Sequence, residues 1–468
     1  MNANRTSSPR IREALRWLIP VVMLALSALA CNLSSTPPPT VPPRLPTSTP
    51  QATIGISTQV PIALPGSVES EAPLDPGLDA LLRQIDPGRL MKHVEAMYSV
   101  ETRYINSTQT SPNRGIGAAR KYIHDAFVSY AALAEGRMTV WDHPFTVTWE
   151  DQQTLQYNVV ATLQGTEAGS GVIVVGAHYD SIANDVDPVL FAPGADDNGT
   201  GIAAMLEMAR IFAEVPQRAT IMFVAFSAEE IGRIGSLRFI DEYLEPFNID
   251  VRSVVTLDTI GNINGPNNTV NNTQIRVFSD DGYNSPSRQL SRVMNLIAMT
   301  YVPDLQVVVQ AAGDREGRWG DHLSFTSRGY PAIRIIEAVQ DPARQNNSRD
   351  TIEIVNPDYL TRSTRVALAT VAVLANGLQP PSNISLRTSN DPNNNTLVWS
   401  PVDGAAGYVL ALRQPGALTY NQVLNVTATN SLTWGGFTPD RFETVAIATI
   451  DDAGRWGPFS PEYPLERP

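Results

Sequence analysis

Five short segments in the middle of this chain carry residue types that bind metal ions. They contain His178, Glu230, Asp258 and His322, and an acidic pair that begins at Asp196. Imidazole and carboxylate groups suit zinc, and two metal ions about 3.5–4 Å apart can activate one water molecule while polarising a carbonyl. Two histidines and several carboxylates are the set that such a pair requires. The residue types therefore predict a two-metal hydrolytic centre.

The apolar pattern of the chain predicts the elements that position these residues. The runs Val172–Ala177, Thr220–Phe226 and Val251–Leu257 are nearly continuous, as in central strands covered on both faces, and Ala332–Ile336 is a fourth. Helical spacing over Gly201–Glu214 lies between the first two, and strands that alternate with helices indicate a parallel sheet. We therefore predict an α/β domain with a mostly parallel mixed sheet sandwiched by helices.

The candidate ligands follow the carboxyl ends of these strands, where open α/β sheets bind their ligands. His178 follows the first strand, Glu229 and Glu230 follow the second, and Asp258 follows the third. Taken singly, a His or Asp at a strand end is more often a cap or turn residue, and acidic pairs are usually solvated. Several such residues at one edge of one sheet favour a metal centre instead.

The segments GAHYDS, PGADDNGTG, FSAEEIG, TLDTIG and GDHLSF follow one another in this order. Together they resemble the co-catalytic di-zinc aminopeptidases typified by bacterial leucyl aminopeptidase and aminopeptidase Y, over about residues 81–378. This resemblance implies a zinc exopeptidase-like fold and two Zn²⁺ per chain. It implies that Asp196 bridges the two ions, with His178 and Asp258 completing one site and Glu230 and His322 the other.

The same resemblance implies the supporting roles and the reaction. Glu229 would be the general base, which takes a proton from the attacking water and returns it to the leaving amine. Asp180 matches the residue that hydrogen-bonds the ligand His and so fixes its tautomer. The family's cis peptide bond would lie at Asp196–Asp197. The implied activity is an extracellular metallo-exopeptidase, an aminopeptidase that removes N-terminal residues from peptides.

The sequence leaves other functions open. The fold also serves carboxypeptidases. Asn262–Gly320, which is expected to line the substrate pocket, carries no pattern that indicates which substrate side chains are preferred. Glutaminyl cyclases use a single zinc, and a non-catalytic receptor or adhesin would have lost its metals, so the complete set of five ligands argues against both. A solvated loop is expected over Arg315, Glu316, Arg318 and Trp319, with contact to the substrate as the alternative. Surface or packing roles are expected for three further histidines, namely His93, His124 and His143.

The start of the chain predicts export. Four arginines are followed by an apolar run from Trp17 to Ala30 and then by Cys31, the only cysteine. This is the layout of a secretory signal peptide, and the run is short for a membrane span. Cys31 also sits as in the lipobox of bacterial lipoproteins, where the cysteine is acylated. We expect a lipid-anchored protein on the extracellular face of the cell membrane, with plain secretion or an uncleaved signal anchor as alternatives.

Composition divides the rest of the chain. A signal peptide over 1–31 precedes a Pro/Ser/Thr-rich stalk over 32–80, the di-zinc peptidase domain over 81–378 and a β-rich tail over 379–468. The tail resembles a fibronectin type III module, a small all-β sandwich with Trp399 and Tyr408 in its core. It is expected to be a spacer, with binding to a cell-surface polymer as the alternative. A net charge of -13 argues against nucleic acid as a partner.

Overall fold

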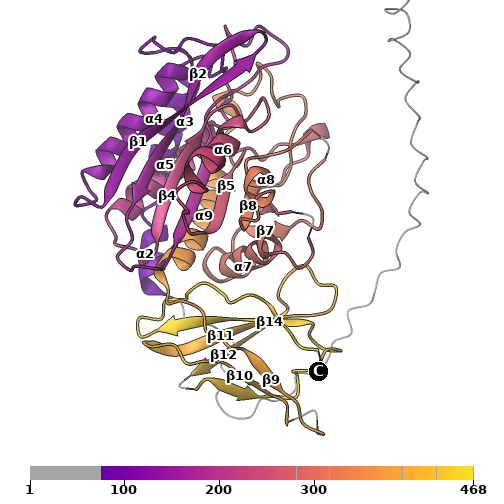
Figure 1. The fold of residues 1–468 in the computed structure, drawn as a ribbon. Helices are drawn as coiled ribbons and strands as arrows, with labels where there is room; N and C mark the ends of the chain where they lie inside the picture. Colours follow the sequence, from indigo (N-terminus) through magenta and orange to yellow (C-terminus); the bar gives the residue numbers. More distant parts are fainter. Residues whose placement is uncertain (1–74, 281, 316, 392–393, 428, 467–468) are drawn as a thin grey trace, which may run out of the picture. The chain divides into compact units, whose positions relative to one another are not determined.

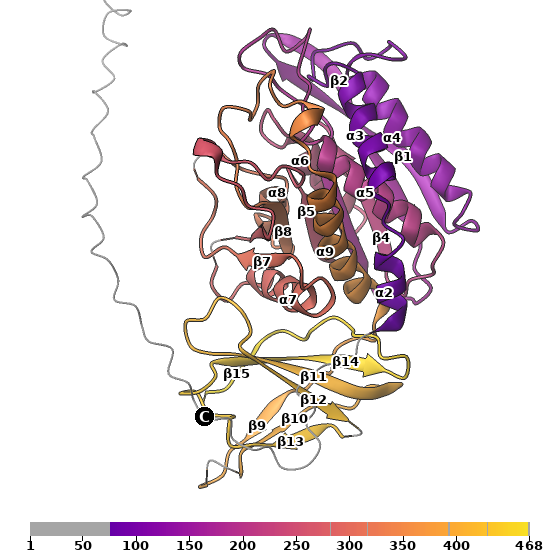
Figure 2. The same ribbon diagram turned by 180° about the vertical axis from the view of Figure 1, so that it is seen from behind.

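The computed structural model describes residues 75–280, 282–315, 317–391, 394–427 and 429–466 (Figures 1 and 2). The predicted signal peptide, Cys31 and the stalk as far as residue 74 lie outside the described residues. Within the described part of the chain, no helix combines the length and the apolar character needed to cross a membrane.

An eight-stranded sheet forms the centre of the larger domain (Figure 1). The four central strands, in the order β4-β3-β5-β8, are parallel to one another, whereas β2 is antiparallel to β4 and β6 is antiparallel to β8. This confirms the predicted α/β class with a mostly parallel mixed sheet. The strands are β1 (Met138–Trp149), β2 (Gln152–Leu163), β3 (Val172–His178), β4 (Thr220–Phe226), β5 (Val251–Leu257), β6 (Gln274–Phe278), β7 (Gln306–Val309) and β8 (Ala332–Glu337).

Helices cover both faces of this sheet (Figure 2). One face carries α2 (Pro76–Leu82), α3 (Pro87–Ser99), α4 (Gly115–Ala131), α5 (Gly199–Ala213), α7 (Pro286–Tyr301) and α9 (Pro357–Asn376). The other face carries α6 (Ile234–Phe239), the π-helical turn η1 (Ile240–Leu244) and α8 (His322–Thr326). Two 3₁₀ turns, η2 (Pro266–Asn268) and η3 (Ile352–Ile354), lie in the loops.

The larger domain begins with two separate helices. Helix α2 ends at Leu82, and α3 begins at Pro87 with Asp86 as its N-cap. Proline fits the first helical position because its missing N–H is not needed there, and the Asp86 carboxylate accepts the N–H of Arg89 at 2.8 Å. Helix α2 begins within the range predicted as stalk, and its Leu78 is buried against the main core.

The tail folds as two antiparallel sheets around a core of its own. Its strands are β9 (Ser385–Arg387), β10 (Thr396–Val398), β11 (Ala405–Arg413), β12 (Gln422–Thr427), β13 (Ser431–Thr433), β14 (Thr444–Asp451) and β15 (Tyr463–Pro464). Trp399 and Tyr408 are buried in this core with their rings 5.2 Å apart, which confirms their predicted place. The small all-β module is therefore confirmed, and its fibronectin type III identity stays a prediction.

The larger sheet of the tail is buried on both faces. Leu410 and Ile447 point into the tail's own core, whereas Val409 and Ala448 belong to the hydrophobic core of the larger domain and are fully buried. Alternate residues of a strand point to opposite faces, so β11 and β14 contribute to both cores. The tail is therefore an integral part of the packing over residues 75–466.

Candidate metal centre

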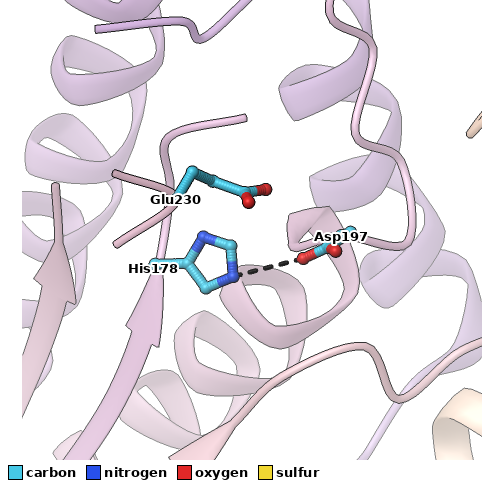
Figure 3. Close-up of side chains that lie close together, drawn as sticks. All are labelled: His178, Asp197 and Glu230. Carbon is cyan, nitrogen blue, oxygen red and sulfur yellow. Dashed lines mark ion pairs between the residues drawn. The ribbon is translucent and has the colours of Figure 1, made fainter. Parts of the chain in front are cut away.

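His178 is the centre of a buried group of ionisable side chains at the carboxyl ends of β3, β4 and β5. Its Nε2 atom lies 3.2 Å from Asp197 Oδ1, 3.8 Å from Asp258 Oδ1 and 4.0 Å from Glu229 Oε2. Donor atoms of His178, Asp197 and Glu230 lie within 4.8 Å of one another, and Figure 3 shows these three side chains turned toward a common point. The parallel strands thus bring together four of the segments found in the sequence.

The acidic turn contributes its second aspartate, not its first. Asp196 Oδ1 accepts the N–H of Gly261 at 2.9 Å and lies 3.2 Å from Thr200 Oγ1, so that its side chain is used in holding the loops together. Asp197 is the residue that faces His178. The cis peptide bond joins Asp197 to Asn198. The predicted cis bond at Asp196–Asp197 is therefore wrong by one residue. The side chain that faces His178 is that of Asp197 and not that of Asp196, the residue predicted to bridge the two ions.

Two polar side chains fix the acidic turn. The Asp350 carboxylate accepts the backbone N–H groups of Asp196 and Asp197 at 2.8 and 2.9 Å. The Asn198 side chain caps α5 by accepting the N–H of Gly201 at 3.0 Å, and it donates to the Leu257 carbonyl at 2.7 Å. A Cβ atom at Gly201 would lie 2.3 Å from Asn198 Oδ1, so only glycine fits there. The turn is therefore tied to the end of β5.

His322 is not one of the three residues whose donor atoms converge within 4.8 Å in the described part of the chain, although the Asp258 carboxylate lies near enough to act on its pKa, so its role as a ligand stays a prediction. It begins α8, which packs against β5, β8 and α6, and its Nδ1 atom is buried without a hydrogen-bond partner among the described residues. Burial lowers the pKa of His322 well below its usual value, and the nearby Arg334 guanidinium adds to this effect.

Asp180 connects two of the strand ends. Its two carboxylate oxygens accept the backbone N–H groups of Glu229 and Glu230, each at 3.1 Å. The predicted partner, His178, presents Nδ1 to the backbone carbonyl of Asp180 at 3.2 Å, with the carboxylate 3.7 Å away. Asp180 therefore positions the glutamates directly and the imidazole mainly through its main chain.

Arg103 also holds these loops in place, and no sequence pattern indicated this role. Its fully buried guanidinium donates to the carbonyls of Tyr179, Met97, Pro193 and Gly194 at 2.7–2.9 Å. The carbonyls of Tyr179, Pro193 and Gly194 belong to the segments that follow β3 and precede the acidic pair, and the carbonyl of Met97 belongs to α3. A buried carbonyl without a donor is costly, so this one side chain stabilises both segments.

Arg318 is a second arginine of the site, in a segment expected to be a solvated loop. Its Nη1 atom donates to Asp197 Oδ2 at 3.2 Å, and its Nη2 atom lies 3.5 Å from Asp258 Oδ1. The Arg318 side chain is only 11% exposed, so the prediction of a solvated loop is wrong at this residue. Trp319, which follows it, is 54% exposed and agrees with that prediction.

The charges of the centre shift one another's pKa values. Burial alone would lower the pKa of His178, but Glu229 and the neighbouring carboxylates raise it well above its usual value. Burial raises the pKa of Glu229 and of Glu230 well above the ordinary range. Burial acts in the same direction on Asp258, but Arg318, His178 and Arg334 together outweigh it and lower the pKa of this carboxyl group. The centre is thus a buried site in which the carboxylates outnumber the positively charged groups.

The donor atoms present fit one zinc ion. Asp197 Oδ1 and Asp258 Oδ1 are buried and accept no hydrogen bond within the described part of the chain, although both face His178 Nε2. Buried carboxylate oxygens normally have hydrogen-bond donors or bind a cation. Imidazole nitrogen and carboxylate oxygen are both zinc ligands in proteins. These residues, together with Glu230, can therefore hold a zinc ion.

The other histidines lie elsewhere, as predicted. His93 contacts the hydroxyls of Tyr122 and Tyr130 at 2.8 and 3.2 Å. His124 lies 3.0 Å from Asp142, and His143 is buried 3.2 Å from the amide of Asn158. They are packing or partly exposed residues outside the group.

The sheet, its helical layers and this group of side chains define a metallohydrolase of the zinc exopeptidase fold. The sequence model of peptidase family M28 matches residues 158–371. A "Probable zinc metalloprotease" of Pyricularia oryzae is 33% identical over 400 residues, which cover 77% of this chain and 80% of that protein. The chain belongs to peptidase family M28 and is a zinc metallopeptidase.

Solved structures show the same fold. LapB of Legionella pneumophila has a TM-score of 0.52 at 24% identity, covering 65% of this chain and 77% of that one. The LapA aminopeptidase of the same organism has a TM-score of 0.52 at 23% identity, covering 66% and 78%. At this level of identity the likeness concerns the fold.

Proposed function

We propose that this protein is an exopeptidase whose centre binds zinc through His178, Asp197, Glu230 and Asp258, with Glu229 as the general base. The observation that carries the proposal is the convergence of His178, Asp197 and Glu230 within 4.8 Å, with Glu229 beside the imidazole. Bound zinc would supply a Lewis acid that polarises the scissile carbonyl and makes a water molecule more acidic.

Glu229 performs the proton transfers in this proposal. Its backbone is held by Asp180, and burial, together with the neighbouring acidic groups, raises the pKa of its carboxyl group. A carboxylate with a raised pKa accepts the proton of the attacking water more readily and can return it to the leaving amine. The reaction adds one water molecule across the peptide bond and gives a carboxylate and a free amine, so no acyl-enzyme is needed.

We propose aminopeptidase polarity, which is supported by the resemblance of the sequence motifs and by the fold shared with the LapA aminopeptidase. One observation favours the alternative of a carboxypeptidase, because Arg318 presents a guanidinium beside the centre and guanidinium groups bind carboxylates well. A panel of peptides with a free or acetylated amino end and a free or amidated carboxyl end distinguishes the two. Cleavage that requires the free amine supports the proposal, and cleavage that requires the free carboxylate contradicts it.

The cellular location is a separate proposal, supported by the sequence only. We propose that the protein is exported and anchored to the outer face of the cell membrane by lipid on Cys31. Expression of Cys31→Ser beside the parent chain tests this, because loss of the lipid should move the protein from the membrane to the soluble fraction. An unchanged membrane fraction would contradict lipidation. A polymer ligand for the tail stays a prediction, which a pull-down on cell-wall material would test.

A further inference from the structure

We infer that the centre of this chain holds one zinc ion and not two, and that Arg318 and Asn346 occupy the positions from which a second ion would be bound. The inference rests on the zinc site proposed above. It departs from the two ions that the sequence motifs predict.

The number of ligands sets the first limit. A catalytic zinc uses about three protein ligands, so two ions that share one carboxylate need roughly five ligand residues. The described residues bring together one imidazole, that of His178, and the three carboxylates of Asp197, Glu230 and Asp258. This set suffices for one ion and is too small for two.

Arg318 takes the oxygen that a bridging aspartate would give to a second ion. Asp197 Oδ1 faces His178, and Asp197 Oδ2 instead accepts a hydrogen bond from Arg318 at 3.2 Å. The guanidinium stays protonated at any ordinary pH. Its fixed positive charge lies next to two of the proposed ligands, where it repels a second cation and partly neutralises the carboxylates in its place.

Asn346 occupies the remaining approach to Glu230. Its Nδ2 atom donates to Glu230 Oε2 at 2.9 Å. A carboxylate only accepts hydrogen bonds, so the amide presents its NH₂ group, which has no lone pair to give to a metal. Zinc prefers imidazole nitrogen or thiolate sulfur to a neutral amide. The position next to Glu230 therefore lacks the donor that a second zinc site requires.

The first test measures zinc content in the full chain. Protein loaded with excess ZnCl₂ and freed of unbound metal by gel filtration should contain one zinc per chain by mass spectrometry. Protein loaded with Co²⁺ should give the EPR signal of an isolated ion, without coupling between two. Two zinc ions per chain would overturn the inference and leave the proposed function intact. A chain that binds no zinc would overturn both.

The second test adds the missing site. The double variant Arg318→Ala/Asn346→His removes the competing charge and supplies an imidazole beside Glu230, so its zinc content should rise to about two per chain. The control is Arg318→Ala/Asn347→His, because Asn347 donates to the Ala343 carbonyl and does not contact Glu230. The control should stay at one. A folded double variant, checked by circular dichroism, that also stays at one would contradict the roles given to Arg318 and Asn346.

Discussion

Asp180 accepts a hydrogen bond from the backbone N–H of Glu229 at 3.1 Å, although the two residues follow different strands of the sheet. The second Asp180 oxygen accepts the N–H of Glu230. One carboxylate therefore sets the position of the proposed base and of a proposed zinc ligand, while its own main chain contacts His178. The spacing between these groups depends on Asp180.

Replacement of Asp180 should weaken both metal binding and turnover. In Asp180→Asn one oxygen can still accept an N–H group, but the amide NH₂ faces the second N–H group and cannot accept it. The loop that carries Glu229 and Glu230 is then held by one hydrogen bond fewer. We expect a loss of about 10–100-fold in zinc affinity, measured by competition with a chelating dye, and a lower kcat. Asp125→Asn, at an exposed ion pair with Lys121, is the control and should change neither. Unchanged affinity in Asp180→Asn would show that the loop is held by other contacts.

Arg103 should be important for stability. Arg103→Lys removes a guanidinium that satisfies four buried carbonyls, and an ammonium group cannot reach all of them, so the free energy of unfolding should fall by about 2–4 kcal/mol. The matched control is Arg83→Lys at the exposed pair with Asp79, where the change should stay within about 0.5 kcal/mol. Urea unfolding measures both. Equal effects would refute the special role of Arg103.

Part of this site could be predicted from the sequence and part could not. The long apolar runs predicted β4, β5 and the residues at which these strands end, because buried parallel strands have a strong apolar pattern. The positions of Glu230 and Asp258 just after these strands could therefore be predicted. The choice between Asp196 and Asp197 depends on the path of a tight turn, which residue types do not encode. Arg318 and Asn346 come from loops far along the chain, where no periodic pattern indicates what they contact.

The buried His93 should make the free energy of unfolding fall as the pH is lowered into the mildly acidic range. Burial lowers its pKa from 6.5 to about 4, so between these values the unfolded chain binds a proton that the folded chain does not. Its contribution to stability is complete above pH 6.5 and is lost as the pH falls toward 4, by on the order of 2–3 kcal/mol. Urea unfolding at several pH values should show a shallower dependence for His93→Gln than for the parent chain. Parallel curves would contradict this.

Removal of the tail should destabilise the larger domain. Val409 and Ala448 of the tail are fully buried in the larger domain's core, and Trp456 packs edge-on against Tyr301 with the ring centres 6.1 Å apart. A chain that ends at residue 378 exposes this apolar surface, so it should aggregate or melt at a clearly lower temperature. Scanning calorimetry and light scattering test this. A soluble truncated chain with the parent melting temperature would show that the tail is an independent spacer.

In the proposed mechanism Glu229 transfers protons at the zinc centre without being a zinc ligand. Glu229→Gln keeps the size of the side chain and removes its basicity, so zinc content should stay that of the parent chain while kcat falls by about 10²–10⁴-fold. Glu95→Gln, at an exposed position of α3, should retain full turnover. The decisive measurement is the turnover of Glu229→Gln at confirmed zinc content. Loss of turnover with zinc retained is the predicted result, and near-normal turnover would contradict the account.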